Sequence, residues 1–167
     1  IQQLCKKQIE IINQLVAQNV AGIAIAANDA DALQPALTEA MDAGIKVISL
    51  DSAVNKDSRQ THIQQADPEK IGRGLIQAAY EMVDGNGGIA VLSATAQATN
   101  QNLWIEWMKK ELEENPEKYA NTPLVKVAYG DDDPTKSTSE TQALLTDSSI
   151  KVIIAPTTVG MLAAGKV

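Results

Sequence analysis

The sequence predicts an α/β protein whose parallel sheets carry helices on both faces. Helical and strand patterns alternate along all 167 residues, and this alternation is typical of parallel sheets. The strands are near-continuous runs of Val, Ile and Ala, as expected for strands covered on both faces. Two Asp-Pro pairs, at 67–68 and 133–134, have the order of an N-cap followed by the first residue of a helix.

The alternation is regular as far as Asp51. Apolar residues recur at helical spacing between Ile9 and Val16, and a glycine, Gly44, closes the second helical pattern, which has Pro35 early in it. We expect, in order, a helix over 6–19, a strand over 22–29, a helix over 30–44 and a strand over 45–51.

The remaining elements follow a polar loop at 52–60. A short, more polar strand at 61–66 has no helix before it, and the regular order then resumes. We expect helices over 67–83, 101–117 and 131–147, strands over 89–96, 123–130 and 150–156, and the start of a further helix at 157.

The irregular strand indicates a boundary between two lobes, because a strand without its own helix can cross from one lobe to another. We place that boundary within residues 52–67. The expected organisation is part of a first lobe over residues 1–52, a crossing segment over 53–67, and part of a second lobe over 68–167.

Composition excludes several classes of function. The formal net charge of −7 opposes binding to nucleic acids and to anionic membranes, which both depend on Lys and Arg. No apolar run approaches the roughly 18 residues of a membrane-spanning helix, so we expect no direct membrane insertion. The single cysteine, Cys5, cannot form an internal disulfide. The chain has no initiator Met, shows no signal peptide and opens inside a helical pattern, so we expect a fragment of a longer protein.

Candidate binding residues stand just after the strands, because ligands of parallel α/β proteins bind at the carboxyl ends of the strands. These positions carry hydroxyls, amides and carboxylates, a set that suits a neutral polyhydroxylated ligand. Such residues also cap turns and helices. Asp67 and Asp133 fit a capping role because Pro follows each. Asp51, at the end of IKVISLD, is followed by SAV, which opens no clear helix, so Asp51 is the stronger binding candidate.

Enzyme motifs are weak or missing. The sequence has no GxGxxG, P-loop or GxSxG pattern, and GNGG at 85–88 precedes a strand, as a turn does. The only histidine, His62, lies in a predicted strand, where a structural role is the commoner one. Cys5 is expected to be inert. Trp104 follows a strand end and could border the apolar face of a sugar, although packing in the core of an amphipathic helix is the alternative. We expect no catalysis, cofactor or metal site.

Several segments resemble the bacterial periplasmic sugar-binding proteins of the ribose-binding type, which supply ABC transporters. The resemblance runs from QIEIINQLVAQN through IKVISLDS, HIQQADPEKIGRG, NQNLW and GDDDPTKS to IIAPTTVGMLAAGKV. NQNLW and IIAPTT are the most specific to the rhamnose-binding and autoinducer-2-binding branch. The resemblance implies two flavodoxin-like lobes of the type I fold, joined by three crossing segments, with the ligand between them. The first strands of the first lobe and the last strands of the second have no counterpart in this chain.

The resemblance also assigns site residues. Asp51 matches the family aspartate that grips ligand from the first lobe, with Ser52 beside it. Asn100 and Gln101 match second-lobe contacts that are usually Asp-Gln, so one carboxylate is replaced by an amide. Pro156 and Thr158 match backbone-contact positions, and Asp131 and Asp132 lie near another contact loop. Together with Trp104, the expected ligand-binding set is Asp51, Ser52, Asn100, Gln101, Trp104, Asp132, Pro156 and Thr158.

The resemblance implies non-catalytic binding of a small rhamnose-like or autoinducer-2-like sugar in an interlobe cleft of a periplasmic protein, for delivery to the membrane permease of an ABC transporter. One alternative is the effector-sensing domain of a sugar-responsive transcription regulator, which would need a helix-turn-helix segment. Others are an enzyme or phosphoacceptor on a flavodoxin-like domain, with Asp51 as the acid, and a truncated or chimeric flavodoxin-like chain without native binding.

Overall fold

The computed structural model describes residues 2–167, which form two compact units. The first unit runs to Ala66 and also includes residues 97–100, and the second contains residues 67–96 and 101–167. Each unit has its own parallel three-stranded sheet. The predicted α/β class with parallel sheets is therefore confirmed, while the expected crossing segment over 53–67 stays a prediction.

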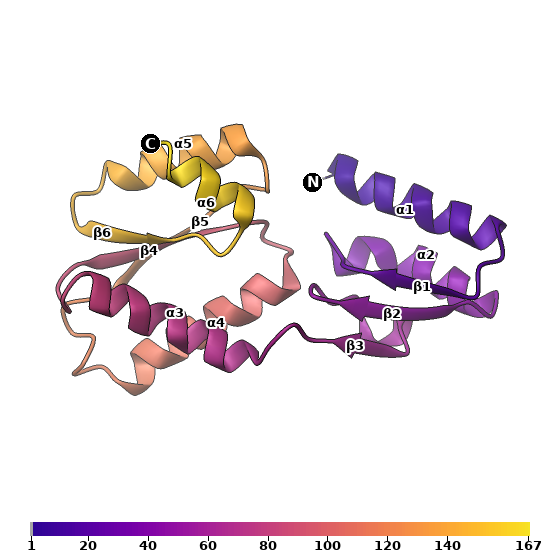
Figure 1. Ribbon diagram of the computed structural model, residues 1–167, viewed down its shortest axis with the longest axis horizontal. Coiled ribbons are helices and arrows are strands. Elements are labelled where there is room, and N and C mark those ends of the chain that lie inside the picture. The colour runs from indigo at the N-terminus through magenta and orange to yellow at the C-terminus, as the bar shows by residue number, and fades with distance from the viewer. Residues whose placement is uncertain (1) are drawn as a thin grey trace. The chain divides into compact units, whose positions relative to one another are not determined.

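The first unit contains two α-helices, three strands and a 3₁₀-helix. Its sheet has the order β1-β2-β3. The elements are α1 (Gln2–Ala17), β1 (Gly22–Ile25), α2 (Ala30–Asp42), β2 (Lys46–Leu50), η1 (Lys56–Ser58) and β3 (Thr61–Ile63), shown in Figure 1. The strands are shorter than their apolar runs predicted, and η1 lies in the segment predicted as a polar loop.

Burial alternates along the strands of the first sheet. Ile23 and Val47 are buried, whereas Ala24 and Leu50 are exposed, as expected when helices cover one face of a sheet. The buried face packs against α1 and α2 in one apolar cluster, which includes Ile12, Ile23, Ile25, Leu33, Leu37, Ile45, Val47 and Val54. This packing leaves the loop after each strand at the carboxyl edge of the sheet.

The second unit has the strand order β5-β4-β6. Its elements are α3 (Pro68–Met82), β4 (Gly88–Ser93), α4 (Thr99–Glu114), β5 (Leu124–Tyr129), α5 (Pro134–Leu145), β6 (Ile150–Ile154) and α6 (Thr158–Ala164). The N-terminal residues of α4, Thr99 and Asn100, belong to the first unit.

All six residues of β4 are buried. Ile89 and Val91 pack against α3 and α4, and Ala90 and Leu92 pack against α5 and α6. The helices therefore cover both faces of this sheet, with α3 and α4 on one face and α5 and α6 on the other (Figure 1). This sheet matches the predicted arrangement.

Both predicted Asp-Pro helix starts are confirmed. One carboxylate oxygen of Asp67 accepts hydrogen bonds from the backbone N–H groups of Glu69 and Lys70. Asp133 accepts one from the N–H of Lys136 at 2.7 Å. These bonds satisfy donors that the first turn of a helix leaves without partners.

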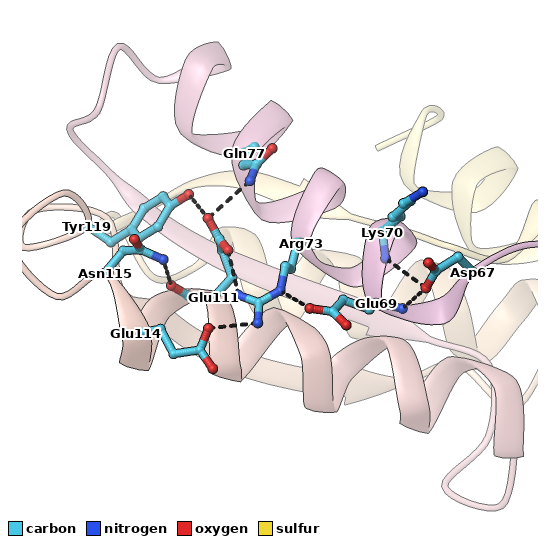
Figure 2. Close-up of polar contacts among 9 residues, drawn as sticks. All are labelled: Asp67, Glu69, Lys70, Arg73, Gln77, Glu111, Glu114, Asn115 and Tyr119. Carbon is cyan, nitrogen blue, oxygen red and sulfur yellow. Dashed lines mark hydrogen bonds and ion pairs between the residues drawn. The ribbon is translucent and has the colours of Figure 1, made fainter.

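A buried carboxylate joins α3 to α4 (Figure 2). Glu111 of α4 is 5% exposed and accepts hydrogen bonds from Tyr119 at 2.7 Å, Arg73 at 2.9 Å and Gln77 at 3.1 Å. Arg73 also forms ion pairs with Glu69 and Glu114. Burial raises the pKa of Glu111, but the hydrogen bonds from Tyr119, Arg73 and Gln77 outweigh it and hold that pKa below its ordinary value.

The two helices approach most closely at Gly72. A Cβ atom added there would lie 2.5 Å from the backbone oxygen of Trp104 and 2.5 Å from the Cβ of Trp107. Gly74, two residues further along α3, has nothing within 4 Å of its corresponding position. Only a residue without a side chain fits at position 72.

We predict that Gly72→Ala destabilises the protein by about 1–3 kcal/mol, because the added methyl group must push the α4 backbone away. Gly74→Ala is the matched control, since alanine favours a helix over glycine by roughly 0.5–1 kcal/mol and meets no obstacle there. Urea unfolding of both variants measures the difference. Equal stabilities for the two variants would contradict the close approach of the helices.

We predict that Glu111→Gln lowers the free energy of unfolding at pH 7 by about 1.5–3 kcal/mol, because hydrogen bonds to a charged group are replaced by weaker ones. The pKa of Glu111 is lower in the folded protein than its ordinary value of 4.5, so the unfolded chain binds more protons. The carboxylate's contribution is thus present above that value and is lost as the pH falls below it.

Urea unfolding between neutral and strongly acidic pH tests this dependence. The stability difference between the natural protein and Glu111→Gln should shrink as the pH falls through the acidic range. Glu113→Gln, which removes an exposed carboxylate from the same helix, is the control. A difference that stays constant with pH would show that Glu111 stabilises the protein through shape rather than charge.

Candidate functional site

The first candidate loop follows β2 and begins at Asp51. The Asp51 side chain is exposed, and its backbone has φ of 56°, in the left-handed region that Asp tolerates better than most residues. The Asp51 N–H donates to the oxygen of Ile63 at 3.2 Å, and the oxygen of Ser52 accepts from the N–H of Ala27 at 3.1 Å. The loop is therefore anchored to the end of β3 and to the segment after β1.

Two consecutive residues of the first unit contact the same loop. The Asn100 side-chain amide donates to Oδ1 of Asp51 at 3.0 Å. The Thr99 hydroxyl lies 3.1 Å from the Ser52 hydroxyl and accepts from the N–H of Ala53 at 2.8 Å. Three of the residues predicted from the sequence, Asp51, Ser52 and Asn100, therefore lie together.

The second unit has a topological switch point at the end of β4. The chain leaves β4 toward α4 on one face of the sheet, whereas it leaves β5 and β6 toward α5 and α6 on the other face. Loops that diverge in this way leave a crevice at the carboxyl ends of the strands, the usual place for a ligand in an open α/β sheet.

Gln101 lies at this switch point and holds the end of β4. Its side chain is 7% exposed, and Oε1 accepts hydrogen bonds from the Ser93 hydroxyl and the Ala94 N–H, both at 2.9 Å. The carbonyl end of this side chain is therefore engaged with the protein itself, which fixes the direction of the amide.

The loops after β5 and β6 are joined by a side-chain hydrogen bond. The Thr157 hydroxyl donates to Oδ1 of Asp132, a residue with φ of 50°. Pro156, Thr157 and Thr158 line an open hollow after β6, together with Ala155, Met161 and Leu162. Asp132, Pro156 and Thr158 thus border the same edge of the second sheet.

Trp104 packs against the apolar core rather than against these loops. It is half-buried and packs against the apolar cluster formed by α3, α4 and β4. The neighbouring Trp107 is contacted by the cations of Lys110, 4.0 Å from the ring centroid, and Arg73, at 5.2 Å. The core packing considered for Trp104 from the sequence is present.

Thr99 and Thr157 are contact residues that the prediction from sequence did not select. Both are threonines at the N-terminal end of a helix. In the structure their hydroxyls contact neighbouring loops. No local pattern in the sequence indicated these partners.

His62 forms a cross-strand pair with Ser49. The Ser49 hydroxyl lies 2.8 Å from Nδ1 of His62 and accepts a hydrogen bond from Arg59 at 3.0 Å. Ser49 is fully buried and His62 is partly buried.

The only cysteine in the sequence, Cys5, is buried. Burial raises the pKa of the Cys5 thiol, which disfavours the reactive thiolate. Within residues 2–167, no group of three or more His, Cys, Asp or Glu side chains is placed to hold a metal ion. None of the helices described in this range has the length and apolar character needed to cross a membrane.

Comparison with solved structures gives several close similarities. A solute-binding protein of an ABC transporter from Clostridium phytofermentas, with bound L-rhamnose, is 49% identical, with a TM-score of 0.91 over 97% of this chain and 50% of the other. A solute-binding protein from Burkholderia graminis, in complex with D-arabinose, is 28% identical, with a TM-score of 0.84 over 95% of this chain and 54% of the other.

LsrB from Clostridium saccharobutylicum, in complex with AI-2, is 25% identical, with a TM-score of 0.85 over 97% of this chain and 52% of the other. The chain therefore spans about half the length of these relatives. Residues 3–167 match the family described as periplasmic binding protein domain. The type I fold and the similarity to sugar-binding relatives of ABC transporters are confirmed. The chain belongs to the periplasmic binding protein domain family.

Proposed function

We propose that this protein binds a small neutral sugar without catalysis and delivers it to the membrane permease of an ABC transporter. The observation that carries the proposal is the carboxylate of Asp51, which is exposed directly after β2 and oriented by Asn100. A carboxylate has about four positions for accepting hydrogen bonds, so one bond from Asn100 leaves capacity for sugar hydroxyls.

The chemistry of the other candidates supports a polyhydroxylated ligand. Ser52, Gln101 and Thr158 carry hydroxyl or amide groups, and Asp132 adds a second carboxylate. Pro156 would offer its backbone oxygen. Trp104 would contribute an apolar ring edge, and this is the least supported assignment because Trp104 packs against the core.

The relatives support the class of ligand. L-rhamnose, D-arabinose and AI-2 are the small molecules bound by the three relatives described above. At 49% identity, the L-rhamnose complex makes L-rhamnose the first probe to test. Asn100 stands where the resembling branch usually has an aspartate, so the favoured sugar can differ from theirs.

The partner and the location follow from family membership. We infer a periplasmic or otherwise extracytoplasmic protein, because that is where proteins of this family bind their ligands. The two-lobe organisation, with part of the first lobe over residues 1–52, a crossing segment over 53–67 and part of the second lobe over 68–167, stays a prediction. So does the interlobe cleft.

We predict that Asp51→Asn weakens L-rhamnose binding by roughly 10-fold to 100-fold, because hydrogen bonds to a charged acceptor are worth about 1.5–3 kcal/mol. Isothermal titration of the protein expressed from its complete gene measures the change. Asp57→Asn, which makes the same charge change at an exposed position in η1, should bind as the natural protein does.

Two results would count against the proposal. If the natural protein gives no saturable heat with L-rhamnose, D-arabinose or AI-2, the proposed class of ligand is wrong. If it binds but Asp51→Asn and Asp57→Asn behave alike, sugar binding stands and the assignment of Asp51 fails.

A further inference from the structure

We propose that Thr99 is a positioning residue that sets the place of the Asp51 carboxylate for ligand binding, an inference that rests on the proposed function. Thr99 itself need not touch ligand. Its hydroxyl holds the two residues that follow Asp51, while the next residue, Asn100, holds the carboxylate itself.

The bonding capacity of a single hydroxyl is fully used at Thr99. A hydroxyl has one proton and two acceptor positions. The Thr99 oxygen accepts from the N–H of Ala53 at 2.8 Å, its proton is donated to the Ala53 oxygen at 3.3 Å, and its second acceptor position can receive the proton of the Ser52 hydroxyl at 3.1 Å. One side chain thus links to both polar backbone groups of Ala53 and to the buried hydroxyl of Ser52.

The backbone at Asp51 makes this support necessary. Asp51 has φ of 56°, which Asp tolerates better than most residues but which is less favourable than extended or right-handed backbone, so bonds that hold the loop stabilise it. The bond from Asp51 to Ile63 holds the start of the loop, and the bond from Ala27 to Ser52 holds its middle. The bonds to Thr99 hold its end at Ala53, so the loop is fixed at three successive residues.

Loss of the Thr99 hydroxyl should therefore reduce affinity without removing a ligand contact. The Ala53 N–H would lose its acceptor, and the loop would have to be reordered when ligand binds. Loss of one ordinary hydrogen bond corresponds to a weakening of up to about tenfold in the dissociation constant. The effect should appear in affinity even when the protein remains folded.

The experiment compares Thr99→Val, which keeps the shape but removes the hydroxyl, with Thr99→Ser, which keeps the hydroxyl. Thr138→Val is the control, because the Thr138 hydroxyl bonds only within α5, to the oxygen of Pro134 at 2.8 Å. The protein from the complete gene is titrated with L-rhamnose, D-arabinose and AI-2. Hydrogen exchange at the Ala53 amide is measured by NMR without ligand.

The expected result is an affinity about tenfold weaker and a faster-exchanging Ala53 amide in Thr99→Val, both restored in Thr99→Ser and unchanged in Thr138→Val. If Thr99→Val does not fold, Thr99→Ala replaces it against the same Thr99→Ser reference. Equal affinities for the natural protein and Thr99→Val would overturn the positioning role alone. No binding of any of the three ligands by the natural protein would overturn the proposed function and this inference with it.

Discussion

The complete burial of β4 is the constraint on which the second unit depends. The central strand of a parallel sheet carries apolar side chains on both faces, and each face must be covered by helices to remove those side chains from water. In the strand order β5-β4-β6, α4 packs on one face of β4 and α5 packs on the other, so both faces have apolar cover. The same crossing makes the loops diverge at the end of β4. The same strand order therefore explains both how helices cover the core and why the candidate site lies at the end of β4.

In the second unit, α3 and α4 are joined by hydrogen bonds and ion pairs as well as by close packing. Taking a carboxylate out of water costs several kcal/mol unless donors replace the lost water. Glu111 receives three such donors, and Arg73 is in turn paired with Glu69 and Glu114. These bonds, with that to Glu111 foremost, raise the pKa of Arg73, so the guanidinium stays charged. An apolar contact could hold two helices together, but this network also fixes their register, which the contact at Gly72 requires.

The sequence predicted what depends on local pattern and failed where partners are distant. The Asp-Pro helix starts were predictable because a cap acts within one turn. The position of Asp51 directly after a strand was predictable because the apolar pattern ends there, while its role in binding stays a prediction. The ligand-binding role of Gln101 stays a prediction, and the sequence did not predict that its carbonyl oxygen accepts hydrogen bonds from Ser93 and Ala94, eight and seven residues earlier in the chain. The Thr99 contact joins residues 46 and 47 apart, and no periodicity carries information over that separation.

The conformation of the strand-end aspartates bears on what the site can do. Asp51, Asp131 and Asp132 all have φ between 50° and 56°, and each follows a strand. Such conformations cost of order 1 kcal/mol or more and persist when neighbouring bonds hold them, as Asn100 does for Asp51 and Thr157 for Asp132. Side chains held in this way lose little freedom when a ligand arrives, which favours binding. Fixed acceptors of this kind suit the recognition of hydroxyl groups.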